Sequence, residues 1–507
     1  MSMKKYFLAF VAIFTLVTNS FSQTNIEGVE EIDSKNIGFI QYNKNPIGYY
    51  IFYKDSKVDK SNEINKLKMY DLNFKETKTI EIQTPKGSTL SEIAFNSKTF
   101  LLNFGTAGKK FFLGYDLNGN KTGEFYFDDL SLVNQAAFNA RTSERSVATI
   151  FPLGEEGFVK YSAQSNLKMG MGMGMGMGMG MGMGMGGKNK NFYFTLKGYS
   201  NSLKEIFTYD ASGDAEIISG EVNFSNEKFI GVTVTKSGKG VKGKQEVNFI
   251  LLNSKTGKLI FETSISDKED YQGVINASYN SDENGFMLVG EYVDKENEVS
   301  MAKITGLVFT SLNADGKIIQ RKKLAYSTEL SKIKSILGEE KGGVYFHNFT
   351  LNEGRWTGIG ELYTKSSSTV ISKELIVLEF DNKFDLISVE SFKKEGTKTK
   401  TIGGSTTTSE LVALSAFDFR YLQQSNEGNS YTIVYRTMVE ENNKVVKNQI
   451  NIGSIYYNGS VFKTSKKLHM GQGEILQLTP GEEGNTVVWD YLKKEKVVRL
   501  TSVQSSE

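Results

Sequence analysis

Two histidines limit the proton-transfer chemistry that this 507-residue chain can perform near neutral pH. His347 lies in the run VYFHNF, and His469 follows an apolar run in KKLHMG. A Ser-His-Asp relay would have to use one of them, but the sequence contains no GxSxG nucleophile elbow. Two histidines are also too few for a three-histidine zinc site. The sequence therefore favours packed or surface histidines over catalytic ones.

The chain contains no cysteine, which excludes several kinds of site. Disulfides, thiolate nucleophiles, cysteine-based zinc sites and a lipid anchor on an N-terminal cysteine are all ruled out. Paired carboxylates for glycoside hydrolysis stay open, because 58 acidic residues offer many pairs whose separation a sequence does not reveal. From this inventory we expect no cofactor and lean toward a protein that is not an enzyme.

A tract of nine Met-Gly pairs begins at Met169. Thioether sulfurs bind soft ions such as Cu(I), so Met169, Met171, Met173 and Met175 are candidate soft-metal ligands. A flexible methionine face could alternatively serve as an adaptable apolar contact surface. Alternating glycines resist any single conformation, however. The favoured interpretation is a low-complexity loop without a function of its own, over residues 169–187.

Two basic segments resemble binding loops only superficially. Residues 236–244, KSGKGVKGK, approach a nucleotide-binding glycine pattern, but both flanks read as strands, whereas phosphate binding needs a helix N-terminus. This segment is predicted to be a basic hairpin. Residues 393–410, KKEGTKTKTIGGSTTTSE, are predicted to form a polar loop whose lysines face water.

Residues 1–22 have the organisation of a signal peptide. Lys4 and Lys5 precede an apolar stretch that is too short to span a bilayer, and Ser20-Phe21-Ser22 suits signal peptidase. Beyond this segment no run reaches 18 apolar residues, so no transmembrane segment is expected. Lys and Arg number 60 against 58 Asp and Glu, which argues against nucleic-acid binding. We expect an exported protein, periplasmic or extracellular and not lipid-anchored.

An acidic or Asn turn followed directly by an apolar strand recurs along the rest of the chain. The clear copies of this turn lie at residues 154–157, 282–285, 338–343, 426–428 and 481–484. Weaker copies lie at 43–48, 96–98 and 226–228. After each of the first seven copies comes a second strand pair joined by a Gly, Asn or Asp turn, such as FILLNSKTGKLIFETSI at 249–265. Each repeat therefore predicts four strands.

The two strands of that second pair differ in pattern, which indicates how the sheets pack. Residues 249–252 are apolar at consecutive positions, so both faces of their strand should be buried, whereas residues 79–83 alternate between apolar and polar. Four-stranded sheets packed face to face give this combination. The chain resembles bacterial secreted β-propeller proteins at the level of architecture. The resemblance implies an all-β fold over residues 23–507, a single β-propeller of eight four-stranded blades.

The last repeat is one strand short, and residues 25–33 are predicted to supply the missing strand and close the propeller. Seven blades or tandem β-sandwiches are the alternative architectures.

The expected function follows from export and architecture. We expect a noncatalytic interaction or scaffold protein of the bacterial cell envelope that binds a protein or a glycan. The alternative is a carbohydrate- or peptide-active propeller enzyme with its site in the central funnel. Trp356, in the insertion GRWTGIGELY, is a candidate binding aromatic, whereas Trp489 is expected in the core.

Overall fold

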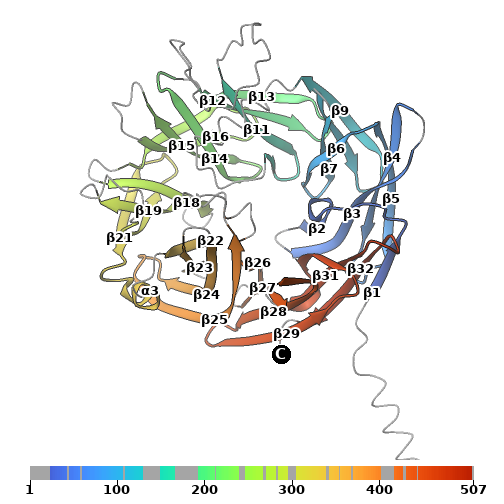
Figure 1. Ribbon diagram of the computed structural model, residues 1–507. Helices are drawn as coiled ribbons and strands as arrows, with labels where there is room; N and C mark the ends of the chain where they lie inside the picture. Colours follow the sequence, from blue (N-terminus) through green and yellow to red (C-terminus); the bar gives the residue numbers. More distant parts are fainter. Residues whose placement is uncertain are drawn as a thin grey trace, which may run out of the picture. The chain divides into compact units, whose positions relative to one another are not determined.

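The computed structural model consists mainly of β-strands (Figure 1). Its chain divides into two compact units. Unit 1 combines Met1–Lys86 with Phe419–Glu507, and unit 2 is Gly87–Asp418. The residues described are 23–42, 45–57, 60–106, 109–128, 149–165, 192–211, 213–238, 246–266, 270–280, 284–294, 304–337, 342–352, 354–366, 369–400, 411, 416–425, 430–441 and 444–504. The predicted signal peptide and the Met-Gly tract lie outside these residues.

Unit 1 contains three antiparallel four-stranded sheets, numbered here by repeat. Repeat 1 is β2 (Ile37–Tyr42), β3 (Asn45–Lys57), β4 (Asn62–Tyr70) and β5 (Glu76–Pro85), preceded by the short helix η1 (Ser34–Asn36). Repeat 7 is β26 (Phe419–Gln424), β27 (Tyr431–Glu441), β28 (Lys444–Tyr457) and β29 (Phe462–Met470). Repeat 8 is β30 (Glu474–Pro480), η3 (Glu482–Gly484), β31 (Asn485–Leu492), β32 (Val497–Gln504) and the N-terminal strand β1 (Gln23–Glu27).

Unit 2 contains repeats 2 to 6. Repeat 2 is β6 (Thr89–Phe95), β7 (Thr99–Thr106), β8 (Lys109–Asp116) and β9 (Lys121–Asp128). Repeat 3 is β10 (Ile150–Pro152), β11 (Gly157–Ser165), β12 (Phe192–Ser200) and β13 (Glu205–Asp210). Repeat 4 is β14 (Ile217–Ser225), β15 (Phe229–Ser237), β16 (Glu246–Asn253) and β17 (Leu259–Ser264). One parallel bridge, between Phe192 and Ile217, joins repeats 3 and 4.

Repeat 5 is β18 (Asp270–Asn280), β19 (Gly285–Asp294), β20 (Gly306–Leu312) and β21 (Ile318–Ala325). Repeat 6 is β22 (Gly342–Asn352), β23 (Arg355–Lys365), β24 (Thr369–Phe380) and β25 (Leu386–Lys400). Between them lies the helix α3 (Ser331–Leu337), whose Ile333 is buried in the core that repeats 5 and 6 share. The all-β fold and the eight sets of four strands predicted from the sequence are therefore confirmed in the described residues.

The N-terminal strand completes the sheet of repeat 8. Residues Gln23 to Glu27 pair antiparallel with Thr501 to Val497 of β32. Ile26, which is 2% exposed, joins Tyr49 and Trp489 in a core that contains residues of repeats 8 and 1. The expectation that the segment before repeat 1 supplies the missing strand is confirmed, although the strand begins two residues earlier than predicted. Trp489 is fully buried, as expected.

The packing pattern predicted for third and fourth strands is also present. In the third strand β16, six consecutive residues are buried, so this strand is covered on both faces. In the fourth strand β5, the last six residues alternate between buried and exposed. The strand pattern in the sequence therefore reflects position within each sheet.

The turn between third and fourth strands packs each repeat against the one before it. In repeat 6, Asp381 Oδ1 accepts hydrogen bonds from the N–H groups of Lys383 and Asp385, both at 2.8 Å. This cap holds Phe384 at φ 61°, a left-handed conformation that is unfavourable for a side chain of this size. In return, the Phe384 ring is buried and stacks on Phe309 of repeat 5 at 5.1 Å between ring centroids.

Where glycine occupies that position, the preceding repeat supplies the ring instead. A Cβ on Gly257 would lie 2.3 Å from Phe207 of repeat 3, and one on Gly316 would lie 2.4 Å from Phe261 of repeat 4. Both glycines have positive φ. One large side chain therefore fills each of these contacts, coming either from the turn or from the repeat before it.

The strands beside two of the predicted loops test those predictions. Lys236 pairs with Glu246 in the antiparallel β15–β16 ladder, which confirms strands on both sides of the basic hairpin, while residues 239–245 lie outside the described part of the chain. The prediction of a loop over residues 393–410 is wrong for its first part. Its first residues extend β25 as far as Lys400, which pairs with Thr369, because alternating Thr and Lys suit an edge strand. Residues 401–410 are not described.

In the described part of the chain, no helix is both long and apolar enough to cross a membrane. The predicted absence of a transmembrane segment is consistent with this finding.

Removing β1 is expected to destabilise the chain. Deletion of Gln23–Glu27 exposes the edge of β32 and removes Ile26 from the core, so the free energy of unfolding should fall by more than about 4 kcal/mol. Urea unfolding measures this change. The substitution Glu27→Gln, at an exposed position of the same strand, serves as the control. An unchanged midpoint in the deletion variant would show that β1 is not part of the cooperative fold.

The left-handed conformation of Phe384 predicts an unusual order of stability among its variants. Phe384→Ala is expected to lower the free energy of unfolding by about 3–5 kcal/mol. Phe384→Gly should be no worse, because glycine at φ 61° avoids a strain of about 1 kcal/mol. At the buried strand residue Phe380 the order should reverse, with glycine worse than alanine. Denaturant unfolding of the four variants tests the contrast, and the same order at both positions would contradict it.

Candidate functional site

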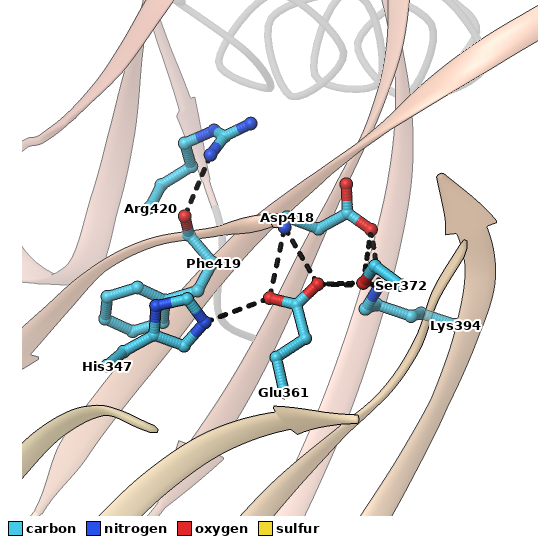
Figure 2. Close-up of polar contacts among 7 residues, drawn as sticks. All are labelled: His347, Glu361, Ser372, Lys394, Asp418, Phe419 and Arg420. Atoms are coloured by element: carbon cyan, nitrogen blue, oxygen red, sulfur yellow. Dashed lines mark hydrogen bonds and ion pairs between the residues drawn. The ribbon is translucent and has the colours of Figure 1, made fainter. Parts of the chain in front are cut away.

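Repeat 6 contains a buried cluster of charged and polar side chains (Figure 2). Each of its four strands contributes one member: His347 from β22, Glu361 from β23, Ser372 from β24 and Lys394 from β25. The fifth member, Asp418, is the last residue of unit 2. We call these five residues the Glu361 cluster.

Breaks in strand register direct these side chains toward one another. The β22–β23 ladder skips His347, and the β23–β24 ladder shifts immediately beyond Ser372. The β24–β25 ladder is interrupted between the pairs Glu374–Lys393 and Ser372–Thr397, so Lys394 lies in a bulge. Because bulges re-aim side chains and often lie beside functional sites, three of them together mark this part of repeat 6.

Glu361 is the centre of the cluster. Its carboxylate lies 3.1 Å from His347 Nε2 and 3.1 Å from Lys394 Nζ. The backbone N–H of Asp418 donates to both carboxylate oxygens, at 2.9 and 3.0 Å. The Ser372 hydroxyl donates to Glu361, and Lys394 donates to both Ser372 and the Asp418 carboxylate. Every member of the cluster is therefore engaged with another member.

The cluster is almost completely removed from solvent. Glu361 and Ser372 are 0% exposed, Asp418 is 1% exposed, and the Lys394 side chain is 1% exposed. The His347 side chain, at 9%, is the most accessible. Burying two carboxylates and an ammonium carries a large desolvation penalty, which mutual pairing has to offset.

Burial and pairing shift the two carboxyl pKa values in opposite directions. Burial alone would raise the pKa of Glu361, but the hydrogen bond from His347 and the positive charge of Lys394 outweigh it, so that pKa lies well below its ordinary 4.5. Burial raises the pKa of Asp418 above its ordinary value; Lys394 opposes this effect and the charge of Glu361 adds to it. Glu361 is thus the carboxylate that keeps its charge most firmly.

Aromatic rings enclose the histidine. Its ring meets Tyr345 edge-on at 4.8 Å and Phe417 edge-on at 5.6 Å between centroids. Tyr345 in turn stacks on Phe417 at 4.4 Å, and Phe417 belongs to a small apolar core with Val370 and Ala416. The residues just before Asp418 are therefore anchored by packing as well as by charge.

The chemistry available to the cluster depends on access. A serine hydroxyl beside a lysine amine is a pair that serves elsewhere as nucleophile and base. Here the Ser372 hydroxyl donates to Glu361 while it accepts from Lys394, and both side chains are buried. The geometry instead supports a positional role, in which Glu361 binds the N–H of the residue at which the chain leaves unit 2.

A second carboxylate, that of Glu92, also binds backbone N–H groups, between repeats 2 and 3. Glu92 of β6 accepts hydrogen bonds from the N–H groups of Thr149 and Ile150, at 3.0 and 3.1 Å, where the first strand of repeat 3 begins. Burial raises the pKa of Glu92, and the hydrogen bonds from Thr149 and Ile150 oppose that rise. Binding of backbone N–H groups by a carboxylate thus occurs at two places in unit 2, at Asp418 and at Thr149–Ile150.

The structure places both histidines and Trp356, which were singled out from the sequence. His347 is packed inside the Glu361 cluster, and His469 Nε2 lies 3.7 Å from Asp490 Oδ2, beyond hydrogen-bond range. Trp356 requires a correction: it is 5% exposed and packs in the core of repeats 5 and 6, so its ring is not available to a partner as a surface contact.

Met169, Met171, Met173 and Met175 lie outside the described residues. Among the residues that are described, no group of three or more His, Asp or Glu side chains is placed to hold a metal.

Sequence reasoning missed Glu361, Ser372, Lys394 and Asp418. The available signal was a charge inside an otherwise apolar run, as Glu361 in GIGELY and Asp418 in AFDF. Because buried charges are normally paired, each such residue indicates an unseen partner. The identity of that partner depends on strand register, which the sequence does not specify.

Neutralising Glu361 tests the electrostatics of the cluster. Because the folded-state pKa of Glu361 is lowered from 4.5, its contribution to stability is present above about pH 4.5 and is lost as the pH falls below it. Glu361→Gln is expected to lower the free energy of unfolding at pH 7 by about 3 kcal/mol and to flatten the acid limb of the stability profile. Urea unfolding at a series of pH values measures both effects.

The control for this measurement is Glu124→Gln, at an exposed residue paired with Lys121. That change should cost less than about 0.5 kcal/mol. If the Glu361→Gln profile runs parallel to that of the unmodified chain, the lowered pKa of Glu361 is refuted.

Three solved structures illustrate what the chain is similar to, all at low identity. The WD40 domain of SCAP from fission yeast shares 9% identity, covers 96% of this chain and 99% of its own, and has a TM-score of 0.37. The β-propeller domain of the Trilobed protease from Pyrococcus furiosus shares 11% identity over 74% of this chain and 99% of its own, with a TM-score of 0.30.

An acylaminoacyl peptidase from Pyrococcus horikoshii shares 11% identity, with a TM-score of 0.32. The match covers 85% of this chain and 59% of the peptidase. No curated protein matches the sequence. A family described as a family of unknown function, DUF6770, matches residues 1–171, 185–372 and 366–502. The chain therefore belongs to the DUF6770 family.

Proposed function

We propose that the protein is an exported, noncatalytic interaction protein of the bacterial cell envelope, periplasmic or extracellular, that binds a protein or a glycan. Its eight four-stranded sheets form a single eight-bladed β-propeller, closed by pairing of β1 with β32. The rigid sheets serve as a scaffold, and the turns and outer strands present the binding surface.

Support for the propeller comes from within each unit. In unit 1, β1 completes repeat 8, and the same core holds Trp489 of repeat 8 and Tyr49 of repeat 1. In unit 2, the turn of each of repeats 3 to 6 packs on the repeat before it, as Phe384 does on Phe309. Consecutive face-to-face packing of four-stranded sheets is the propeller arrangement.

The observation that carries the noncatalytic assignment is the state of the Glu361 cluster. Ser372 and Lys394, the pair with the greatest nucleophilic potential here, are buried and bonded to each other and to two carboxylates. A nucleophile needs both a free lone pair and a path for substrate. These side chains are instead used to fix the end of unit 2.

The hydrogen bond between Lys394 and Ser372 is also the basis of the competing function, that of a hydrolytic enzyme. If repeat 6 opened enough to admit an ester or peptide bond, this pair could act as nucleophile and base in a hydrolytic enzyme. The two functions make opposite predictions for one variant, Ser372→Ala.

Isolation of the chain from its native envelope tests the proposal. A tagged chain with its own residues 1–22 should be recovered outside the cytoplasm, begin at Gln23, and carry a crosslinked protein or glycan partner. Ser372→Ala should retain that partner at an unchanged yield. Recovery of an intact Met1 N-terminus from the cytoplasm would refute export. A partner-free monomer whose glycan or peptide hydrolysis is abolished by Ser372→Ala would establish the enzyme.

A further inference from the structure

The fourth strands of unit 2 share an irregularity at their beginning. In repeats 2 to 6 the ladder between third and fourth strands skips one residue near the start of the fourth strand. That residue is Thr122 in repeat 2 and isoleucine in each of repeats 3 to 6. These isoleucines, here called the isoleucine row, are exposed by 43%, 44%, 68% and 49% at Ile206, Ile260, Ile319 and Ile387. A recurrent exposed isoleucine is unusual, because apolar side chains on a surface normally occur singly.

Direct contacts join the turn before each isoleucine to the fourth strand of the neighbouring repeat. The turn of repeat 4 packs through Gly257 against Phe207, which follows Ile206 in the chain. Thr263 of repeat 4 donates to the carbonyl of Gly316 in the next turn, at 2.6 Å. Gln320, which follows Ile319, donates to the carbonyl of Lys383 in the turn of repeat 6, at 3.0 Å. The turns of repeats 4, 5 and 6 therefore each lie against the fourth strand of the repeat before them.

Lysines accompany the isoleucines at a regular spacing. Lys204, Lys258 and Lys317 are exposed, and each precedes an isoleucine of the row by two residues. In repeat 6 the exposed lysine is Lys383, one residue before Phe384.

Two acidic residues at these turns are already paired. Glu205 forms an ion pair with Lys197 at 3.3 Å, and Asp385 forms one with Lys322. Asp315 and Asp381 also lie at these turns, and Asp381 accepts hydrogen bonds from backbone N–H groups of its own turn. Exposed lysines nevertheless outnumber these two acids, at Lys204, Lys255, Lys258, Lys317 and Lys383.

The bulges exclude the addition of a partner's β-strand to these edge strands. An incoming peptide strand needs a regular row of backbone donors and acceptors, whereas a bulge interrupts the row and twists the edge away. Each fourth strand in the row is bulged within its first three residues. The isoleucine row is thus unsuited to strand addition, and its recognition must rest on side chains.

We propose that the isoleucine row docks unit 2 on an anionic lipid bilayer. The isoleucines enter the boundary between headgroups and acyl chains, while the lysines reach anionic headgroups, as apolar and basic residues do at membrane interfaces. A protein partner would need four apolar pockets at the spacing of the row, whereas a fluid bilayer accepts projecting side chains at any spacing. This inference goes beyond the proposed function and rests on unit 2 alone.

Vesicle flotation with the purified chain beginning at Gln23, the predicted mature form, tests the proposal. The chain should bind vesicles of phosphatidylcholine with about 30 mol% phosphatidylglycerol more strongly than vesicles of phosphatidylcholine alone. Replacing all four isoleucines of the row by serine should weaken binding at least about tenfold. Replacing Lys204, Lys258 and Lys317 by glutamate should remove the preference for anionic lipid.

A matched control uses exposed apolar residues of unit 1. Leu468 and Met470, at the far end of the fourth strand of repeat 7, are 57% and 64% exposed, and their joint replacement by serine should leave binding unchanged. An Ile319→Trp variant reports position directly, because Trp356 and Trp489 are buried and its new emission should shift to the blue on anionic vesicles. Circular dichroism confirms that each variant folds.

Three results would overturn the proposal. One is absence of binding to both kinds of vesicle. Another is binding that the isoleucine variant retains. The third is a combined result: the unmodified chain binds no vesicles, and the isoleucine variant loses a crosslinked protein partner. That result would assign the row to a protein interface. Loss of vesicle binding with an unchanged envelope partner would support membrane docking and leave the proposed interaction function intact.

Discussion

Packing between successive repeats is the interaction on which the other features of each unit depend. A four-stranded sheet alone cannot bury both faces of its inner strands, so stability requires a neighbour on each side. The third-to-fourth-strand turn provides the contact, through Phe384 on Phe309 or through Phe207 over Gly257. In repeats 4 to 6 this turn lies against the fourth strand of the repeat before it, and an exposed isoleucine follows it in the chain.

Much of the fold was predictable because it is local. Acidic turns, consecutive apolar runs and alternating runs specify strands and their burial, and they recur often enough to reveal eight repeats. The N-terminal strand was predictable because the last repeat lacks one. Lys393–Lys400 was missed because a polar edge strand has the composition of a loop. Trp356 was misassigned because its burial depends on the packing of repeat 5 against repeat 6.

The Glu361 cluster lay beyond prediction for a different reason. Its hydrogen bonds join residues that are 11 to 57 positions apart in the sequence, and its members converge through three register breaks. A bulge changes which side chain faces which, and no residue type in the sequence demands one there. The charged members were visible as isolated polar positions, but their pairing was not.

The pairing of β1 with β32 has a consequence for the order in which the chain folds. In unit 1, the Tyr491 hydroxyl donates to the carbonyl of Val29 across 462 residues of sequence. Contacts at such separation form slowly, because the loop between them must close first. Residues 23–86 therefore emerge earliest but complete their core last, whereas unit 2 is continuous and can fold as soon as Asp418 is available. Until then the first strands present unpaired edges, and they require protection from aggregation.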